Sequence, residues 1–276
     1  MERARTFQNR WVFPRPLSAA ARAIEALRDL PPSGMNEATK TRALLTAAER
    51  SLLQGKGIDV GCGPDPISAT CQRFDVEDGD ANRITDHVTD LGSFDFVASI
   101  HSLEHMRSPE ASLRDWWALV RPGGVLLLVV PDEDLYEQGY WPSIFNPEHQ
   151  STFTLSKQAS WSPVSRNLLD LAKGLPGVEI VSLRLQDHAY DRRLLAPSFW
   201  PHRWAGLSSF LRSRIPPRGA LRIRVLQSLY AILRLPIDQT YGKATAQIVA
   251  ILRKVSRETD GDPACRVLPR EGGDER

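Results

Sequence analysis

The sequence predicts an α/β fold in which a mostly parallel sheet is covered by helices. Three apolar segments predict buried strands, at residues 56–60, 93–100 and 125–130, and the last of these is apolar on both faces. A helix is expected between the second and third strands. The order of strand, helix and fully buried strand indicates a parallel sheet, because parallel neighbours need a long crossover connection.

The helix between the second and third strands has clear boundary signals. Ser108 suits the N-cap, Pro109 the first helical position and Glu110 the positive end of the helix dipole. A Pro-Gly-Gly run at residues 122–124 is expected to end the helix. The residues that share its apolar face are Leu113, Trp116, Trp117 and Val120.

Two glycines, Gly61 and Gly63, follow the first strand. Glycine permits a tight reversal of the chain and lets backbone N–H groups approach a ligand closely. Such a turn is typical of nucleotide-binding folds, although the same turn can serve the fold alone. The segments downstream decide between these two interpretations.

Three segments carry a resemblance to a known family: DVGCGP at residues 59–64, SFDFVASIHSLEHM at residues 93–106 and LVRPGGVLLLVVP at residues 119–131. In this order they resemble the class I S-adenosylmethionine-dependent methyltransferases, and most closely the type 11-like branch, over about residues 55–135. The resemblance implies a Rossmann-like, mostly parallel sheet of seven strands with an antiparallel last strand. It also implies S-adenosyl-L-methionine as the cofactor, at the carboxyl ends of the strands.

The chain divides into five predicted parts. A helical lead-in precedes the methyltransferase core, and a basic amphipathic helical insertion separates strand six, residues 178–185, from strand seven, residues 245–254. In order, the parts are residues 1–54, 55–188, 189–240, 241–257 and 258–276, the last expected to be disordered. We expect lead-in helices at residues 18–30 and 37–54, the second burying Ala43, Leu44, Ala47, Ala48 and Leu52.

Composition is that of an ordinary soluble enzyme. The 276 residues are 42% hydrophobic and 25% charged, enough for one sizeable core with room for an insertion. Cys62, Cys71 and Cys265 are too few and too irregularly spaced for a disulfide framework or a zinc site, so no metal is predicted. No membrane span or signal peptide is evident, and a net charge of +2 does not predict a nucleic-acid partner. We therefore expect a cytoplasmic protein.

The resemblance assigns cofactor contacts first to the glycine turn. The backbones of Gly61 and Gly63 would pass beside the methionine part of the cofactor, and Asp59 would hold either the loop or the cofactor's amino group. Only about a dozen residues separate this turn from Asp75. The helix that normally follows the turn must therefore be short or replaced by a loop.

The ribose and adenine contacts are assigned to the next segment. Asp75 ends a short strand at residues 71–74, where a carboxylate can accept hydrogen bonds from both ribose hydroxyls, with Glu77 as the alternative. Asp80 and Ala81 resemble the segment that contacts adenine, and the alternative for Asp80 is a polar turn around Gly79.

Transfer to an amine or hydroxyl releases a proton, so a general base is expected. Two catalytic candidates are His101, which leaves the strand end on the side of the transferred methyl group, and His149, in a loop of acids and aromatics. His188 is a weaker alternative. Glu104 and His105 more readily serve the start of the next helix than the chemistry.

The acceptor is predicted from two features. The loop at residues 131–149 combines carboxylates, an amide and aromatic rings, which suits a sugar, a nucleotide-sugar or a lipid-linked glycan. The arginine-rich segment at residues 190–236 is typical of a solvated helix face. The alternative is contact with an anionic partner, either a phosphate-bearing substrate or an acidic membrane surface, and the latter would place the protein at the inner membrane face. The oligomeric state stays open.

Three other functions are compatible with parts of the pattern. A binding protein could retain this fold without turnover. An NAD-dependent oxidoreductase is disfavoured because the third glycine of its fingerprint is missing. A DNA methyltransferase is disfavoured because no Asn/Asp-Pro-Pro-aromatic tetrapeptide occurs.

Overall fold

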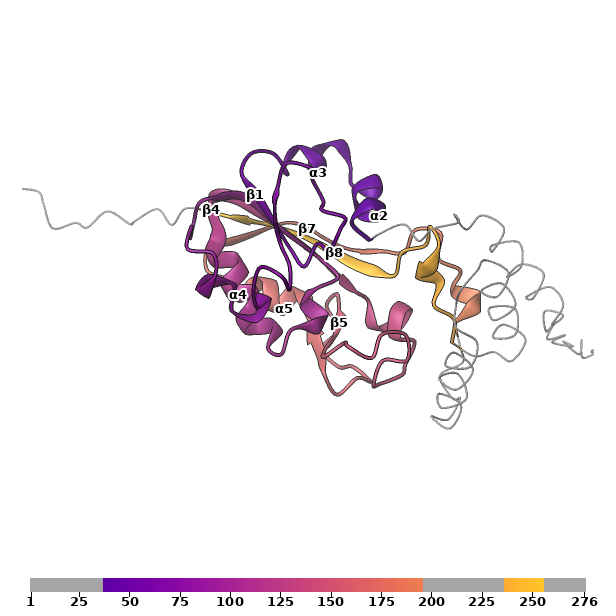
Figure 1. Cartoon of the computed structure of the whole chain (residues 1–276). Helices are drawn as coiled ribbons and strands as arrows, with labels where there is room; N and C mark the ends of the chain where they lie inside the picture. The colour runs from indigo at the N-terminus through magenta and orange to yellow at the C-terminus, as the bar shows by residue number, and fades with distance from the viewer. Residues whose placement is uncertain (1–36, 196–235, 256–276) are drawn as a thin grey trace, which may run out of the picture.

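The computed structural model describes residues 37–195 and 236–255, which form a sheet with helices on both faces (Figure 1). Six strands of this part pair in the order β2-β1-β3-β4-β8-β7. The strands are β1 (Gly57–Val60), β2 (Gln72–Phe74), β3 (Phe94–Ile100), β4 (Val120–Pro131), β7 (Val178–Gln186) and β8 (Gln247–Lys254). The α-helices are α2 (Glu37–Leu44), α3 (Ala47–Ser51), α4 (Pro109–Leu119) and α5 (Leu168–Lys173).

The strand directions confirm the mixed α/β sheet. β1 pairs in parallel with β2 and β3, and β3 pairs in parallel with β4. β8 is antiparallel to both β4 and β7, as predicted for the last strand. The parallel strands therefore end at one edge of the sheet, where the loops that follow them come together.

The main sheet has six strands within the described residues, 37–195 and 236–255, and not the seven that were predicted. The segment between β2 and β3 forms turns and the 3₁₀ helix η1 (Ala81–Asp86) instead. This segment is rich in acids around Gly79 and has no run of apolar residues that could form a buried strand. The prediction of a missing helix after the glycine turn is confirmed, since residues 61–71 are turns and bends.

The core lies on both faces of the sheet, because alternate residues of β4 point to opposite sides. Leu126 and Leu128 belong to the cluster that contains Trp116 and Trp117 of α4. The cluster on the other face joins Val125, Leu127 and Val129 of β4 to Ala38 of α2, Leu45 and Leu53. Figure 1 shows α2 and α3 on one side of the sheet and α4 and α5 on the other.

The predicted helix at residues 37–54 is wrong in its continuity and its buried face. It breaks after Leu44, and α3 begins anew because Thr46 and Glu49 form a capping box. The buried residues at the break are Leu45 and Leu53. Of the predicted inward face, Ala43, Ala47 and Ala48 are exposed, and Leu44 and Leu52 are half-buried.

The start of α4 is confirmed, with Ser108 at the N-cap and Pro109 at its first position. The helix ends at Leu119, earlier than predicted, because β4 already begins at Val120 and includes the Pro-Gly-Gly run. Both tryptophans are buried, and Trp117 Nε1 donates to the carbonyl of Pro176 at 2.9 Å. This helix therefore packs tightly over the parallel part of the sheet.

Further short elements flank the sheet. β5 (Thr152–Thr154) and β6 (Ser165–Asn167) form a small parallel pair, and η4 (Arg192–Leu194) and η5 (Gln239–Tyr241) are single 3₁₀ turns. Across residues 37–195 and 236–255, no helix is long and apolar enough to cross a membrane. The predicted helix at residues 18–30, the tail at 258–276 and most of the arginine-rich insertion lie outside the described residues.

Candidate functional site

Two adjoining cavities lie at the carboxyl ends of β1 and β3, the place expected for ligands of such a sheet. We call them the β2 cavity, about 890 Å³, which includes Asp75 and Ala81, and the carboxylate cavity, about 510 Å³. Both are lined by Gly61, Gly63 and His101. The two cavities therefore lie side by side at the glycine turn.

The glycine turn requires its glycines. Gly61 has a φ of +73° and Gly63 a φ of +53°, a left-handed conformation that other residues adopt at a cost. A Cβ on Gly61 would lie 2.1 Å from Oγ of Ser102. The Gly61 N–H donates to the carbonyl of Phe74 at 2.7 Å, which ties the turn to the end of β2.

Asp59 lies fully buried on β1 below the turn. Its Oδ2 accepts a hydrogen bond from the Ile67 N–H at 2.7 Å, whereas Oδ1 has no hydrogen-bond partner in the described part of the chain. Burial, with smaller contributions from the charges of Asp65 and Asp75, raises the pKa of Asp59 to about 6. Asp59 lines the carboxylate cavity, so its free oxygen can accept a hydrogen bond from a ligand there.

Asp75 follows β2 and faces the glycine turn. Its Oδ2 accepts from the Gly63 N–H at 2.5 Å and its Oδ1 from the Val76 N–H at 2.7 Å. A carboxylate offers about four acceptor positions, so two remain for a diol in the β2 cavity. Glu77, the alternative ribose contact, is exposed and lines neither cavity.

Asp80 and Ala81 both line the β2 cavity. The Asp80 carboxylate accepts hydrogen bonds from the backbone and side chain of Asn82 and from Arg107. The hydrogen bonds from Asn82, with the charge of Arg107, lower its pKa although slight burial opposes them. Asp80 therefore shapes the wall of the cavity with most of its acceptor positions already used.

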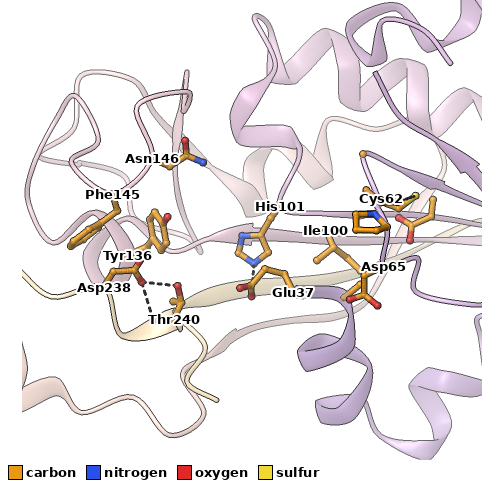
Figure 2. A pocket seen from close by; sticks show the side chains of 15 residues that line it. Glu37, Cys62, Asp65, Ile100, His101, Tyr136, Phe145, Asn146, Asp238 and Thr240 are labelled. Carbon is orange, nitrogen blue, oxygen red and sulfur yellow. Dashed lines mark hydrogen bonds and ion pairs between the residues drawn. The ribbon is translucent and has the colours of Figure 1, made fainter. Parts of the chain in front are cut away.

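His101 leaves β3 with a left-handed φ of +55°, a strained conformation that is common at functional sites. Its Nε2 lies 2.8 Å from Oε1 of Gln247, and its ring lies 3.5 Å from Glu104 and 3.9 Å from Glu37. Figure 2 shows Glu37 and His101 facing one another in the carboxylate cavity.

The protonation state of His101 bears on its predicted role. Burial alone would lower its pKa, but the nearby carboxylates of Glu104 and Glu37, with Gln247, outweigh this and raise the pKa to about 9. The imidazole is then protonated at neutral pH and has no lone pair with which to accept a proton. This state disfavours His101 as the general base and suits it to donate hydrogen bonds.

His149 is buried, unlike the surface histidine that its acidic loop suggests. Its Nδ1 lies 2.7 Å from Oε1 of Glu137, and its ring packs against those of His105 and Tyr136. It lines neither cavity. His188, the weaker candidate, is exposed and also lines neither. Neither side chain is therefore placed to receive a proton directly from an acceptor in these cavities.

The carboxylate cavity contains residues that the sequence did not suggest. Glu37 comes from α2, Asp65 from the loop after the glycine turn, and Asp238 and Thr240 from the segment before β8. No motif links them, because they are far apart in the chain and meet only through the fold. Tyr136, Phe145 and Asn146 form another part of the wall, and they belong to the acidic and aromatic loop that the sequence did single out (Figure 2).

Residues 31–161 match the family model described as a methyltransferase domain. The matched segment is therefore a methyltransferase domain, of a kind that uses S-adenosyl-L-methionine as the methyl donor. The motifs that carry the resemblance lie within the matched segment. No curated protein sequence matches the chain.

Solved structures with a similar fold include several proteins assigned as methyltransferases. One from Galdieria sulphuraria, assigned as a sarcosine dimethylglycine methyltransferase, is 13% identical, covers 86% of this chain and 98% of its own, and has a TM-score of 0.43. A protein from Bacillus halodurans assigned as a methyltransferase is 12% identical, with 86% and 99% covered and a TM-score of 0.43. An S-adenosylmethionine-dependent methyltransferase from Archaeoglobus fulgidus is 12% identical, with 80% and 95% covered and a TM-score of 0.42.

Proposed function

We propose that the protein transfers a methyl group to an amine or hydroxyl of a small polar acceptor that occupies the carboxylate cavity. The observation that carries the proposal is that Gly61, Gly63 and His101 line both cavities. A cofactor whose adenosine part lies in the β2 cavity could extend past the glycine turn to Asp59 and present its methyl group in the carboxylate cavity. Holding donor and acceptor in line is the main catalytic requirement of such a transfer.

The chain's own residues fit the cofactor. S-adenosylmethionine supplies a methyl group on a positively charged sulfur. Asp75 would accept hydrogen bonds from the ribose hydroxyls with its two remaining acceptor positions. Asp59 would accept from the amino group with its unpartnered Oδ1, which removes the cost of a buried unsatisfied oxygen. Asp80 and Ala81 would border the adenine.

The charge of the carboxylate cavity supports the choice of acceptor. Glu37, Asp65 and Asp238 line it in addition to Asp59. Protonated His101 is the single positive group among its described lining residues, none of which is a lysine or arginine. Tyr136 and Phe145 add apolar faces on which a sugar ring or an alkyl chain can pack. A protonated amine or a neutral polyol suits this surface better than the phosphate of a nucleotide-sugar, which the acids would repel.

Glu37 is the side chain that we assign to receive the acceptor's proton. Its Oε1 accepts a hydrogen bond from Lys40 at 2.7 Å, and its Oε2 faces His101 in the cavity. One third of the side chain is exposed, so a proton can leave to solvent. His101, with its raised pKa, would then donate a hydrogen bond to the acceptor or to Glu37. It would not remove the acceptor's proton.

A transfer assay with radiolabelled S-adenosylmethionine tests the proposal. The acceptor panel contains primary and secondary amines, neutral sugars and polyols, sugar phosphates and nucleotide-sugars. We expect label in an amine or a neutral polyol. Preferred labelling of the phosphorylated acceptors would contradict the acceptor class. Cofactor binding without labelling of any acceptor would count against turnover and favour a binding protein.

A variant pair tests the role of Glu37 on the acceptor that the panel identifies. Glu37→Gln should lower kcat by about 10²-fold or more while leaving cofactor affinity unchanged, which is the usual size of general-base catalysis. Glu179→Gln is the matched control, because Glu179 is exposed on β7 and pairs with Arg253 far from the site. Equal turnover of the two variants would remove Glu37 from the mechanism.

A further inference from the structure

We propose that Glu104, His105 and His149 form a binding site for a divalent transition-metal ion beside the β2 cavity. One ligand atom from each of these residues lies within 4.8 Å of the other two. Two imidazole nitrogens and a carboxylate oxygen are ligands typical of Zn²⁺, Mn²⁺ and Fe²⁺. The sequence predicted no metal site, since the ligands come from segments more than forty residues apart in the chain.

The backbone holds the two ligand segments together before any ion binds. Glu104 and His105 belong to the 3₁₀ turn η2 (Leu103–His105), which follows β3. The N–H groups of Gln150 and Ser151 both donate to the carbonyl of Glu104, at 2.7 and 3.2 Å. These bonds fix the loop that carries His149 against η2, so the ligands are positioned by the fold.

Both histidines are oriented by hydrogen bonds from Nδ1. The Nδ1 of His149 lies 2.7 Å from Oε1 of Glu137, and the Nδ1 of His105 lies 3.2 Å from the carbonyl of Glu148. A carboxylate and a carbonyl can only accept, so each Nδ1 carries a proton, and in the neutral imidazole Nε2 is then the nitrogen with the lone pair for a metal ion. A histidine that donates from one ring nitrogen to a carboxylate or carbonyl is the usual arrangement around a protein-bound metal.

Glu104 supplies independent support for a cation at this place. Its side chain is 1% exposed, and neither of its carboxylate oxygens has a hydrogen-bond partner in the described part of the chain. His101 offsets part of its charge, with Nδ1 at 3.5 Å from Oε1, but does not satisfy either oxygen with a hydrogen bond. A buried carboxylate without hydrogen bonds is costly, and a bound metal ion would satisfy it.

The site adjoins the cavity assigned to the cofactor. His105 lines the β2 cavity together with Ser102, Met106 and Glu148. Three protein ligands leave at least one coordination position open, as in metal sites that bind a substrate group or water. A bound ion would thus add positive charge to the wall of the β2 cavity at His105.

Calorimetric titration of the full-length protein tests the proposal directly. The protein is stripped of metal with a chelator, desalted, and titrated with Zn²⁺, and separately with Co²⁺ while its visible absorption is recorded. We expect one equivalent of Zn²⁺ to bind and raise Tm, Co²⁺ to give an absorption band of a nitrogen- and oxygen-ligated ion, and Mg²⁺ to bind far more weakly.

Variants locate the ion. His105 is only half-buried, so His105→Gln is the ligand substitution least prone to unfold the protein, and it should weaken Zn²⁺ binding by 10²-fold or more. Glu137→Gln, which alters the partner of His149 and not a ligand, should weaken it by about 10- to 100-fold. His188→Gln is the matched control and should bind Zn²⁺ like the wild type, because His188 is exposed and outside the cluster.

Two results would overturn the proposal. Failure of the folded wild-type protein to bind either Zn²⁺ or Co²⁺ would show that the cluster is only a hydrogen-bonded core network. Equal Zn²⁺ binding by wild type and His105→Gln, with circular dichroism showing both to be folded, would place the ion elsewhere in the chain. Either outcome leaves the assignment of the cofactor and acceptor cavities unaffected.

Discussion

Oδ2 of Asp75 accepts a hydrogen bond from the backbone N–H of Gly63 at 2.5 Å. This contact joins the end of β2 to the glycine turn after β1, without the helix that would usually separate them. The carboxylate is thereby held where it faces both the turn and the β2 cavity. The same short connection explains how Asp75 reaches the β2 cavity although no helix follows the glycine turn.

Substitution of Gly61 tests the geometry of the turn. Gly61→Ala places a Cβ 2.1 Å from Oγ of Ser102 and must adopt a φ of +73°. The left-handed backbone and the overpacking together should lower the free energy of unfolding by roughly 2 to 4 kcal/mol, measured by urea denaturation. Displacement of Ser102 also breaks its hydrogen bond to the carbonyl of Val60.

The control separates backbone strain from the clash. Gly92 has a similar φ of +63°, and a Cβ there would meet nothing within 4 Å. Gly92→Ala should therefore cost only about 1 to 2 kcal/mol, the cost of the left-handed conformation. If both substitutions destabilise equally, the contact with Ser102 does not require glycine at position 61.

The buried carboxyl of Asp59 predicts a pH dependence of stability. Its pKa of about 6 in the folded protein lies above the usual 3.8, because burial disfavours the charged form. The folded state therefore holds the proton more tightly than the unfolded chain does. The stabilising contribution of this group is complete below about pH 4 and is lost as pH rises through about 6.

Comparison with Asp59→Asn isolates this contribution, since the amide does not titrate. The free energy of unfolding of the wild type relative to the variant should fall by about 3 kcal/mol between pH 4 and pH 7. Asp132 has a pKa similarly raised to about 6 by burial, but it is present in both proteins and cancels. Parallel pH profiles for the two proteins would contradict the assigned pKa.

Glu133 organises the small β5 and β6 pair beside the site. Its fully buried carboxylate accepts hydrogen bonds from the hydroxyls of Thr152 at 3.0 Å, Ser160 at 2.7 Å and Ser165 at 2.6 Å. Glu133→Ala leaves these hydroxyls without their acceptor, so it should cost at least about 3 kcal/mol in urea denaturation.

The neighbouring carboxylate is the matched control for Glu133. Asp134 is partly exposed and pairs with Lys157 and with Trp161. Asp134→Ala should change stability by no more than about 1 kcal/mol, as exposed ion pairs usually do. A comparable loss in both variants would mean that the buried network around Glu133 does not stabilise the loop region.

Local patterns predicted the central part of the fold. Apolar runs marked β3 and β4, Ser108 and Pro109 marked the start of α4, and the antiparallel pairing of β7 with β8 was expected from the family resemblance. These features depend on residues that are close together in the chain. The break at Leu45 was missed because helix propensity around it is high, and only the capping box at Thr46 and the burial of Leu45 reveal it.

Contacts between distant segments could not be predicted in the same way. Gly61, Gly63, Asp75 and Ala81 were named from their motif and do share one cavity. Glu37 and Asp238 line the other cavity only because α2 and the segment before β8 fold over the same edge of the sheet. His149 was named as a base from its loop of acids and aromatics, and its burial against Glu137 arises from tertiary packing that alternation of polar and apolar residues does not encode.

The most direct test of the central claim is calorimetric titration with S-adenosylmethionine and S-adenosylhomocysteine, with NADH as the control ligand. We expect both sulfur ligands to bind the wild type and Asp86→Ala, whose carboxylate is exposed and lines neither cavity, and NADH not to bind. Asp75→Ala should bind them at least about 10-fold more weakly, as loss of hydrogen bonds to a carboxylate predicts, while remaining folded by circular dichroism. Unchanged affinity in folded Asp75→Ala, or no binding to the wild type, would contradict the cofactor site described for this turn.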